Sequence, residues 1–166
     1  KMLHKLFQLL DRVKPASIAW AHCDIPCGIY DPHLAQLAAH TVVRMDVLIS
    51  EVKQAPPTDA DTRKKMIRYV SVKEQHAEIV KHELRILWAD YFKPEHLQKF
   101  PGLHEMFWNA LKAASKAKQG ANVADAEALL EAVNKIADIF WKTKDVKSAK
   151  VKAPYPTGKD VVWPKV

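Results

Sequence analysis

The sequence predicts an all-α protein, an up-down-up-down four-helix bundle with an N-terminal metal-binding hook. Two observations lead to this fold class. Apolar residues recur at intervals of three and four residues over most of the chain, which is the period of one helix face. The connections between these periodic stretches are short, and short connections place successive helices side by side and antiparallel.

The first two helices come from the longest periodic stretches. The first should begin after Asp31-Pro32, an N-cap with proline in the first turn, and end before Gln54 to Asp59. Its expected inward residues are Leu34, Ala38, Thr41, Met45, Leu48 and Val52. The second should run from about Asp61 to Tyr91, with Lys73 as the one misfit in its stripe. The inward residues expected there are Met66, Val70, Lys73, Ala77, Val80, Leu84, Leu87 and Tyr91.

Two more helices and a tail complete the expected fold. Pro94 and Pro101 bracket a turn-rich connector, and a third helix should span Leu103 to Lys118 with Gly120 at its end. Its expected inward residues are Phe107, Ala110 and Ala114. Asp125 can cap a fourth helix, whose inward residues should be Ala126, Leu129, Val133, Ile136 and Phe140. Residues 145–166 hold three prolines and seven charged residues, so we expect a basic extended tail, loosely docked or mobile.

The segment His22-Cys-Asp-Ile-Pro-Cys-Gly-Ile-Tyr30 predicts a metal site. It holds both cysteines and an adjacent histidine, with Pro26 and Gly28 able to curl the chain. Thiolate and imidazole favour Zn, Cu, Ni or iron-sulfur chemistry over Mg or Ca. A closed zinc site needs four protein ligands, and only three side chains are obvious here. A free α-amine on His22 and the amide nitrogen of Cys23 would complete a square plane typical of Ni(II) or Cu(II).

This segment, continued through Asp31-Pro32, resembles the N-terminal hook of the nickel superoxide dismutase family in ligand identity and spacing. Trp88-Ala-Asp-Tyr-Phe-Lys-Pro-Glu-His96 and Ile139-Phe-Trp-Lys-Thr-Lys144 are also similar to that family. The similarity extends from His22 to about Lys144. We therefore divide the chain into a leader (residues 1–21), the hook (22–30), the helical bundle (31–144) and the tail (145–166).

The resemblance implies an enzyme that converts superoxide to dioxygen and hydrogen peroxide with a nickel ion cycling between Ni(II) and Ni(III). It assigns His22, Cys23 and Cys27 as nickel ligands and implies a homohexamer. It also implies that a processing protease removes the leader between Ala21 and His22. While the leader remains, the nitrogen of His22 is an amide without a free lone pair, so we expect the chain as written to be an inactive precursor.

Residues around the ligands also receive roles from the resemblance. The resemblance assigns Tyr30 to cover the open face of the metal and limit access. Asp24 is separately expected to accept hydrogen bonds from the backbone amides of the hook and fix its curl, not to transfer protons. Tyr91 aligns with a second aromatic residue near the site, although its helical spacing fits core packing nearly as well. The Ile25-Pro26 peptide bond is expected to be cis by resemblance.

The family holds the ligand imidazole with a glutamate and an arginine, and this chain departs from that pattern. The matching positions are Ala38 and His76. His76, a water molecule or a neighbouring subunit could take over this support. The sequence therefore predicts that the metal binds, but it does not predict which group tunes the redox potential of the metal.

Other sites and functions are less well supported by the sequence. A non-catalytic copper or zinc binder would use the same hook. A nucleic-acid-binding helical protein is suggested only by the net charge of +7 and pI of about 9.4. Aromatic and basic residues do not alternate as base stacking requires, so we expect no nucleic-acid partner. A positive field would instead attract superoxide, which is an anion.

A second metal site within the helices and a membrane location are also disfavoured. No Glu-x-x-His pair occurs, so the cluster Glu74, His76, Glu78, His82 and Glu83 is interpreted as a solvated face. His33 and His40 are likewise expected on the surface. No apolar run of 18 residues indicates a membrane span. Two cysteines committed to a metal suit a reducing compartment, so we expect the protein in the cytoplasm.

Overall fold

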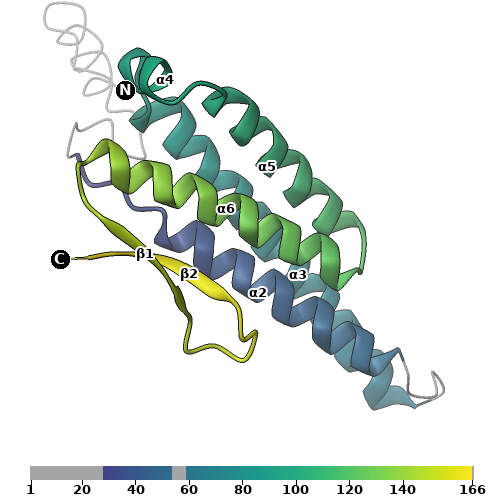
Figure 1. The fold of residues 1–166 in the computed structure, drawn as a ribbon. Helices are drawn as coiled ribbons and strands as arrows, with labels where there is room; N and C mark the ends of the chain where they lie inside the picture. Colours follow the sequence, from purple (N-terminus) through teal and green to yellow (C-terminus); the bar gives the residue numbers. More distant parts are fainter. Residues whose placement is uncertain (1–27, 54–58, 166) are drawn as a thin grey trace, which may run out of the picture.

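The structure is a computed structural model that describes residues 28–53 and 59–165 (Figure 1). The elements follow in this order: α2 (His33–Val52), α3 (Ala60–Ile86), the π-helical turn η1 (Leu87–Tyr91), α4 (Pro94–Lys99), α5 (Leu103–Gln119), α6 (Val123–Thr143), β1 (Ser148–Lys152) and β2 (Asp160–Pro164). The predicted leader and the predicted metal ligands of the hook precede the described residues.

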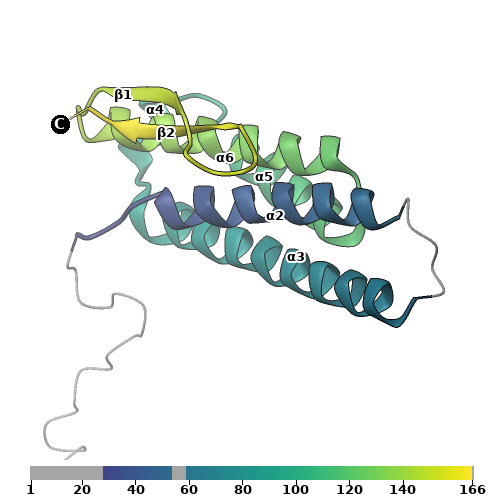
Figure 2. The same cartoon turned by 90° about the horizontal axis from the view of Figure 1, so that it is seen from below.

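The four long helices form the predicted bundle. α2 packs against α3 and α6, and α5 packs against the same two helices, which closes a ring of four. Successive long helices run in opposite directions (Figures 1 and 2). The predicted all-α, up-down-up-down four-helix bundle is therefore confirmed.

Polar side chains start the helices. At α2 the Asp31 carboxylate accepts a hydrogen bond from the His33 amide at 2.7 Å. At α3 the Asp59 carboxylate accepts from the amides of Asp61 and Thr62, a typical N-cap. At α6 the cap is Asn122, not Asp125 as predicted. Asp125 lies in the first turn of α6 and forms an ion pair with Lys116, at 2.8 Å.

The end of the second helix differs from the single α-helix expected there. Its last turn, η1, is π-helical, and the Phe92 amide donates to the Leu87 carbonyl five residues earlier at 3.0 Å. A π turn inserts one extra residue into the helical repeat, and such turns often occur at functional sites. Here the turn ends at Tyr91, which the sequence had placed near the hook.

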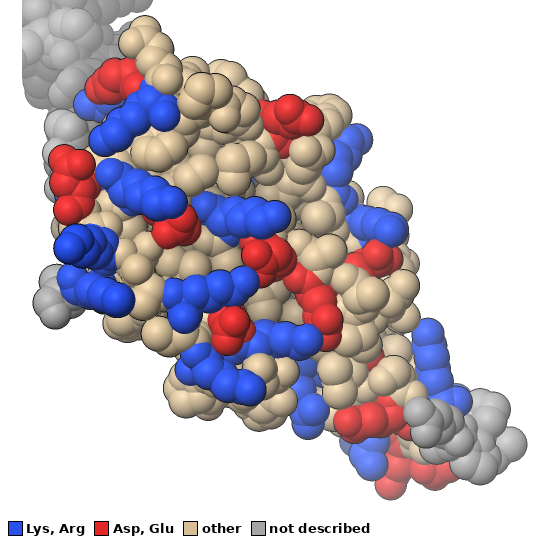
Figure 3. Space-filling view, in the orientation of Figure 1, with Lys and Arg blue, Asp and Glu red and all other residues tan. Residues whose placement is uncertain are grey.

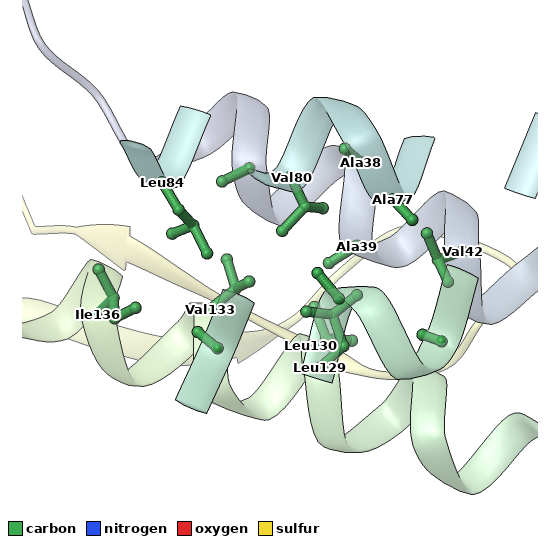
Figure 4. Close-up of a cluster of buried hydrophobic side chains, with 14 of the residues drawn as sticks. Ala38, Ala39, Val42, Ala77, Val80, Leu84, Leu129, Leu130, Val133 and Ile136 are labelled. Atoms are coloured by element: carbon green, nitrogen blue, oxygen red, sulfur yellow. The ribbon is translucent and has the colours of Figure 1, made fainter. Parts of the chain in front are cut away.

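The core is rich in alanine, with leucine and valine between the helices, and the small alanine side chains let the helices approach closely (Figure 4). Every inward residue predicted for α5 and α6 is buried, as are Lys73, Ala77, Val80, Leu84 and Leu87 of the second helix. The stripe predicted for α2 is partly wrong, because Leu34 is 56% exposed while the neighbouring Ala35 and Ala39 are buried. α2 is covered on several sides, so its apolar residues do not mark a single face.

Residues 148–164 form an antiparallel β-hairpin in place of the loosely docked tail that the sequence predicted. Ser148 pairs with Pro164, and Lys152 pairs with Asp160. The hairpin packs on α6 and crosses the α2 side of the bundle (Figures 1 and 2). The prediction failed because the strands are held by residues more than a hundred positions earlier in the chain.

Gln36 provides the most specific of these attachments. Its side-chain amide donates to the Val162 carbonyl at 3.1 Å and accepts from the Val162 amide at 2.7 Å. Asn134 of α6 donates to the Asp160 carbonyl at 2.9 Å. Because the amide of Gln36 pairs with Val162 as a neighbouring strand would, both main-chain polar groups of Val162 are satisfied at the outer edge of the hairpin.

His40 is the second point at which α2 holds the hairpin. It is only 3% exposed, in contrast to the surface position predicted for it. Its Nδ1 lies 2.9 Å from the Thr157 hydroxyl, and its ring meets that of Tyr155 edge-on at 5.0 Å. Burial lowers the pKa of His40 below its ordinary value of 6.5, and this outweighs the opposing effect of Asp160. His33 is half-buried and meets the ring of Trp163 edge-on.

Lys73 is buried too, with a side chain that is 2% exposed. Its ammonium group lies 3.9 Å from the buried carboxylate of Asp46 and donates to the main-chain carbonyl of Gly120. Both carboxylate oxygens of Asp46 lack a hydrogen bond from any described residue. Burial therefore raises the pKa of Asp46, while Lys73 acts against that rise. The ion pair joins α2, α3 and the connector before α6.

We expect Lys73→Met to lower the free energy of unfolding by about 3–5 kcal/mol, because it leaves the Asp46 carboxylate buried without a counter-charge. The double variant Lys73→Met/Asp46→Leu should recover most of this loss, since both charges are then absent. Urea unfolding at neutral pH measures both values. A loss below about 1 kcal/mol in the single variant would contradict the role of the pair.

Stability should also depend on His40 below neutral pH. Since the pKa of His40 is lower in the folded state, the unfolded chain takes up its proton first as the pH falls. The contribution of His40 is therefore complete above pH 6.5 and is lost as the pH drops through the folded-state value. Unfolding free energies between pH 5 and 8 should fall less steeply in His40→Gln than in the parent. An equally steep fall in both proteins would contradict this role of His40.

Candidate metal centre

The hook enters the described structure at Gly28. The predicted ligands His22, Cys23 and Cys27, together with Asp24 and the Ile25-Pro26 bond, lie outside the described residues. Gly28 has φ of 68°, in the left-handed region that residues with a Cβ rarely adopt. The sequence expected Gly28 to tolerate positive φ, and the backbone uses that freedom directly after Cys27.

Tyr30 attaches this segment to the bundle. Its ring is half-buried and contacts the ring of Tyr91, with centroids 5.4 Å apart and planes at 53°. Tyr91 belongs to η1 and also contacts Phe140 of α6, with centroids 4.6 Å apart. The base of the hook therefore lies at the end of the bundle where α2 begins and where α3 and α6 end (Figure 1).

The hydroxyl of Tyr91 has a defined direction. The Thr143 hydroxyl donates its single hydrogen to the Phe140 carbonyl at 2.6 Å. The Tyr91 hydroxyl, 2.6 Å from Thr143 Oγ1, must therefore be the donor in that contact. Tyr91 both packs on the core and contacts Tyr30, so the two roles that the sequence left open for it occur together.

The surroundings of Tyr91 bring together the two other segments that carried the family resemblance. Phe92 and His96 of the first segment contact its ring, with His96 stacked at 5.6 Å. Phe140, Thr143 and Lys144 of the second segment contact it from α6. These segments are about fifty residues apart in sequence. The resemblance therefore marks one place on the molecule, in contact with Tyr30 at the described end of the hook.

Lys144 places a positive charge beside Tyr91, and the sequence did not predict a role for this residue. Its ammonium group lies 5.3 Å from the ring centroids of both Tyr91 and Phe140. Such a contact holds a cation over aromatic faces while leaving it accessible to solvent. The signal available in the sequence was its position at the end of the second similar segment.

The two positions that depart from the family are also described. Ala38 is 3% exposed and packs in the core, where it offers no polar group. His76 is half-buried, and its Nδ1 lies 2.8 Å from the Val72 carbonyl in its own helix. Because a carbonyl only accepts, Nδ1 carries the proton, and a neutral His76 keeps Nε2 as an acceptor.

The acidic and histidine-rich part of α3 shows no ligand arrangement. Glu78 pairs with Lys81 and Lys118, at 3.3 and 2.9 Å, which lowers its pKa. Among residues 28–53 and 59–165, no three His, Cys, Asp or Glu side chains are grouped as a metal ion would require. The hook is thus the part of the chain with a suitable donor set.

Removing the hydroxyl of Tyr91 tests its anchoring. Tyr91→Phe keeps the ring contacts but loses the bond to Thr143, so it should lower the free energy of unfolding by about 0.5–1.5 kcal/mol. Tyr91→Ala also loses the ring contacts and should cost about 3–5 kcal/mol. Tyr69→Phe is the control, because the Tyr69 hydroxyl has no hydrogen bond with a described residue, and it should be neutral. Equal losses in Tyr91→Phe and Tyr69→Phe would contradict the assignment.

Comparisons with known proteins identify the family of this chain. The family model described as nickel-containing superoxide dismutase matches residues 17–144. The nickel superoxide dismutase of Streptomyces seoulensis is 41% identical over 124 residues, covering 75% of this chain and 88% of that protein. The one from Streptomyces coelicolor is 38% identical over 143 residues, covering 86% of this chain and 98% of that protein.

Solved structures show the same relationship. A native nickel superoxide dismutase structure at 1.30 Å superposes with a TM-score of 0.65 at 38% identity, covering 74% of this chain and 99% of that chain. A structure in the oxidised ligation state gives a TM-score of 0.66 at 39% identity, covering 75% and 99%. The fold, the match over the hook and bundle, and the level of identity agree: the chain belongs to the nickel-containing superoxide dismutase family.

Proposed function

We propose that this chain is a superoxide dismutase whose nickel ion is held by His22, Cys23 and Cys27 once the leader has been removed. The reaction consumes two superoxide anions and two protons and yields one dioxygen and one hydrogen peroxide. The observation that carries this proposal is the family match over residues 17–144, which includes the hook and both segments that meet around Tyr91.

The donor set of the hook fits nickel. The side chains of Cys23 and Cys27 would offer two thiolates, and the His22 amine and the Cys23 amide two nitrogens. Thiolate sulfur combined with nitrogen in a plane suits Ni(II), and anionic donors favour a higher oxidation state. Bound nickel would supply one-electron chemistry in both directions. The thiols must lose their protons to bind, so nickel uptake should weaken as the pH falls.

The remaining hook residues receive roles around this centre. Tyr30 would limit access to the metal, and its contact with Tyr91 would hold it in that position. Asp24 would accept hydrogen bonds from hook amides. His76, with Nδ1 bound to the Val72 carbonyl, could support the His22 imidazole only through Nε2.

Processing, assembly and location complete the proposal. A protease would cut between Ala21 and His22 to free the α-amine, which offers its lone pair directly, whereas a peptide nitrogen must first lose its proton. We propose a homohexamer located in the cytoplasm. The cytoplasmic location is supported by two cysteines kept for a metal in a reducing compartment. Within the described residues, no helix is both long enough and apolar enough to cross a membrane.

The decisive experiment compares the uncut chain with protein that begins at His22. After incubation with Ni(II) and gel filtration, the trimmed protein should hold about one nickel per chain and remove superoxide rapidly, because its free α-amine completes the donor set. The uncut chain should bind weakly and show little activity. Elemental analysis and the decay of superoxide absorbance measure the two properties.

Cys27→Ser in the trimmed protein is the matched control and should lose both nickel and activity, since it removes one thiolate. Equal activity in cut and uncut protein would contradict the need for the amine. Stoichiometric copper or zinc in the trimmed protein without superoxide loss would contradict the proposed function itself.

A further inference from the structure

The positive charge of this protein is concentrated at its two ends in sequence. Residues 22–141 carry 15 lysines and arginines and 16 aspartates and glutamates, a net charge of −1. Residues 142–166 carry seven lysines and two aspartates, a net charge of +5. Once the leader is removed, this C-terminal segment accounts for the whole positive charge of the molecule.

Most of this segment lies beyond the family match. The match ends at residue 144, whereas β1 begins at Ser148. Three quarters of this chain already covers 99% of a solved relative. The hairpin is therefore an addition to the matched hook and bundle. The family match does not explain why its lysines give it a positive charge.

The open end of the hairpin lies beside the base of the hook. The Lys165 amide donates to the Lys147 carbonyl at 2.8 Å, so these two lysines are neighbours at that end. Trp163 packs edge-on against His33 at 4.9 Å. Asp31, one residue after Tyr30, lines a small cavity together with His33, Trp163 and Pro164. Lys147 and Lys165 thus flank the point at which the hook joins α2.

Only some of the lysines in this segment keep an uncompensated charge. Lys142, Lys150 and Lys159 form ion pairs with Asp138, Glu131 and Glu127, at 2.6 to 2.7 Å. These pairs account for part of the alternating colours over α6 and the hairpin (Figure 3). Lys144, Lys147, Lys152 and Lys165 form no ion pair with any residue that the structure describes, and Lys144 lies over the ring of Tyr91. The nearby acid Asp145 pairs with Lys99, at 3.7 Å.

The four unpaired lysines differ in their distance from the hook. Lys152 is five residues along the strand from Lys147, or roughly 17 Å at the rise of a β-strand. That exceeds the Debye length of about 8 Å at physiological salt, so Lys152 contributes little at the hook. Lys144, Lys147 and Lys165 remain. We refer to these three residues as the lysine rim.

We propose that the lysine rim attracts superoxide to the hook, and that the C-terminal segment is the part of this chain that provides this guidance. The inference rests on the proposed function, because it takes superoxide as the substrate and the hook as its destination. Cations beside a reactive site raise the encounter rate of an anion, by about 10- to 1,000-fold in strongly steered systems. Three exposed cations on an otherwise slightly negative body should give an effect at the low end of this range.

The test uses trimmed, nickel-loaded protein and the second-order rate constant for superoxide loss, measured from about 10 to 300 mM ionic strength. The rim variant is Lys144→Gln/Lys147→Gln/Lys165→Gln. The control variant is Lys53→Gln/Lys64→Gln/Lys65→Gln, which removes the same charge from exposed positions at the opposite end of the bundle. Each sample is compared at equal nickel content, so that loss of metal does not appear as loss of guidance.

At the lowest salt, the rim variant should lose about three- to tenfold in rate and should depend less on salt than the parent. The control should lose clearly less than the rim variant, because its charges lie roughly 30 Å from the base of the hook, at the far end of α2. That distance is about one Debye length at 10 mM salt and several at physiological salt. The matching Lys→Arg rim variant should retain the parent rate, since it keeps the charges. Equal losses in the rim and control variants, or no loss in the rim variant, would overturn the inference. A parent protein without nickel or activity would instead reject the proposed function.

Discussion

The contact between the rings of Tyr30 and Tyr91 fixes where the hook leaves the bundle. Tyr91 can make this contact because a π-helical turn ends at its position, because Phe140 supports its ring and because Thr143 accepts its hydroxyl hydrogen. Each support comes from the end of a long helix. The point at which residues 28–30 meet the bundle is therefore a consequence of how the bundle core ends.

The polar residues buried in the bundle have a different role, which is to fix how its parts are joined. Gln36, His40 and Asn134 each bind a residue of the C-terminal segment. Asp46 and Lys73 join α2 to α3. Apolar packing between alanines and valines would tolerate small shifts of one element along another, whereas a paired amide or a buried ion pair is satisfied in one arrangement only. The hairpin consequently has a defined register on the helices.

These same residues mark the limit of what the sequence could predict. The number and order of the four long helices and the inward faces of α5 and α6 follow from local periodicity, whereas α4 (Pro94–Lys99) lies where the sequence predicts a connector. The hook is recognisable in the sequence because its predicted donors lie within six residues. Lys73 could be seen as a misfit in its stripe, but its partner Asp46 is on another helix. Gln36 and Val162 are 126 positions apart, and periodicity treats a glutamine as a surface residue. A polar side chain is buried only where tertiary structure supplies a partner, which no local pattern reports.

The C-terminal segment also changes how the basic composition of this protein is understood. A pI of about 9.4 would ordinarily suggest a polyanionic partner such as nucleic acid. The structure shows that three of the lysines in this segment are neutralised by carboxylates of α6 and that the unpaired ones divide between the two ends of the hairpin. A surface for a long polyanion would need unpaired cations spread along its length. Cations gathered at the base of the hook favour a small anion that arrives at one point, and superoxide is such an anion. The C-terminal hairpin thereby places Lys147 and Lys165, which lie beyond the family match, at the base of the hook, where Lys144 is the last matched residue.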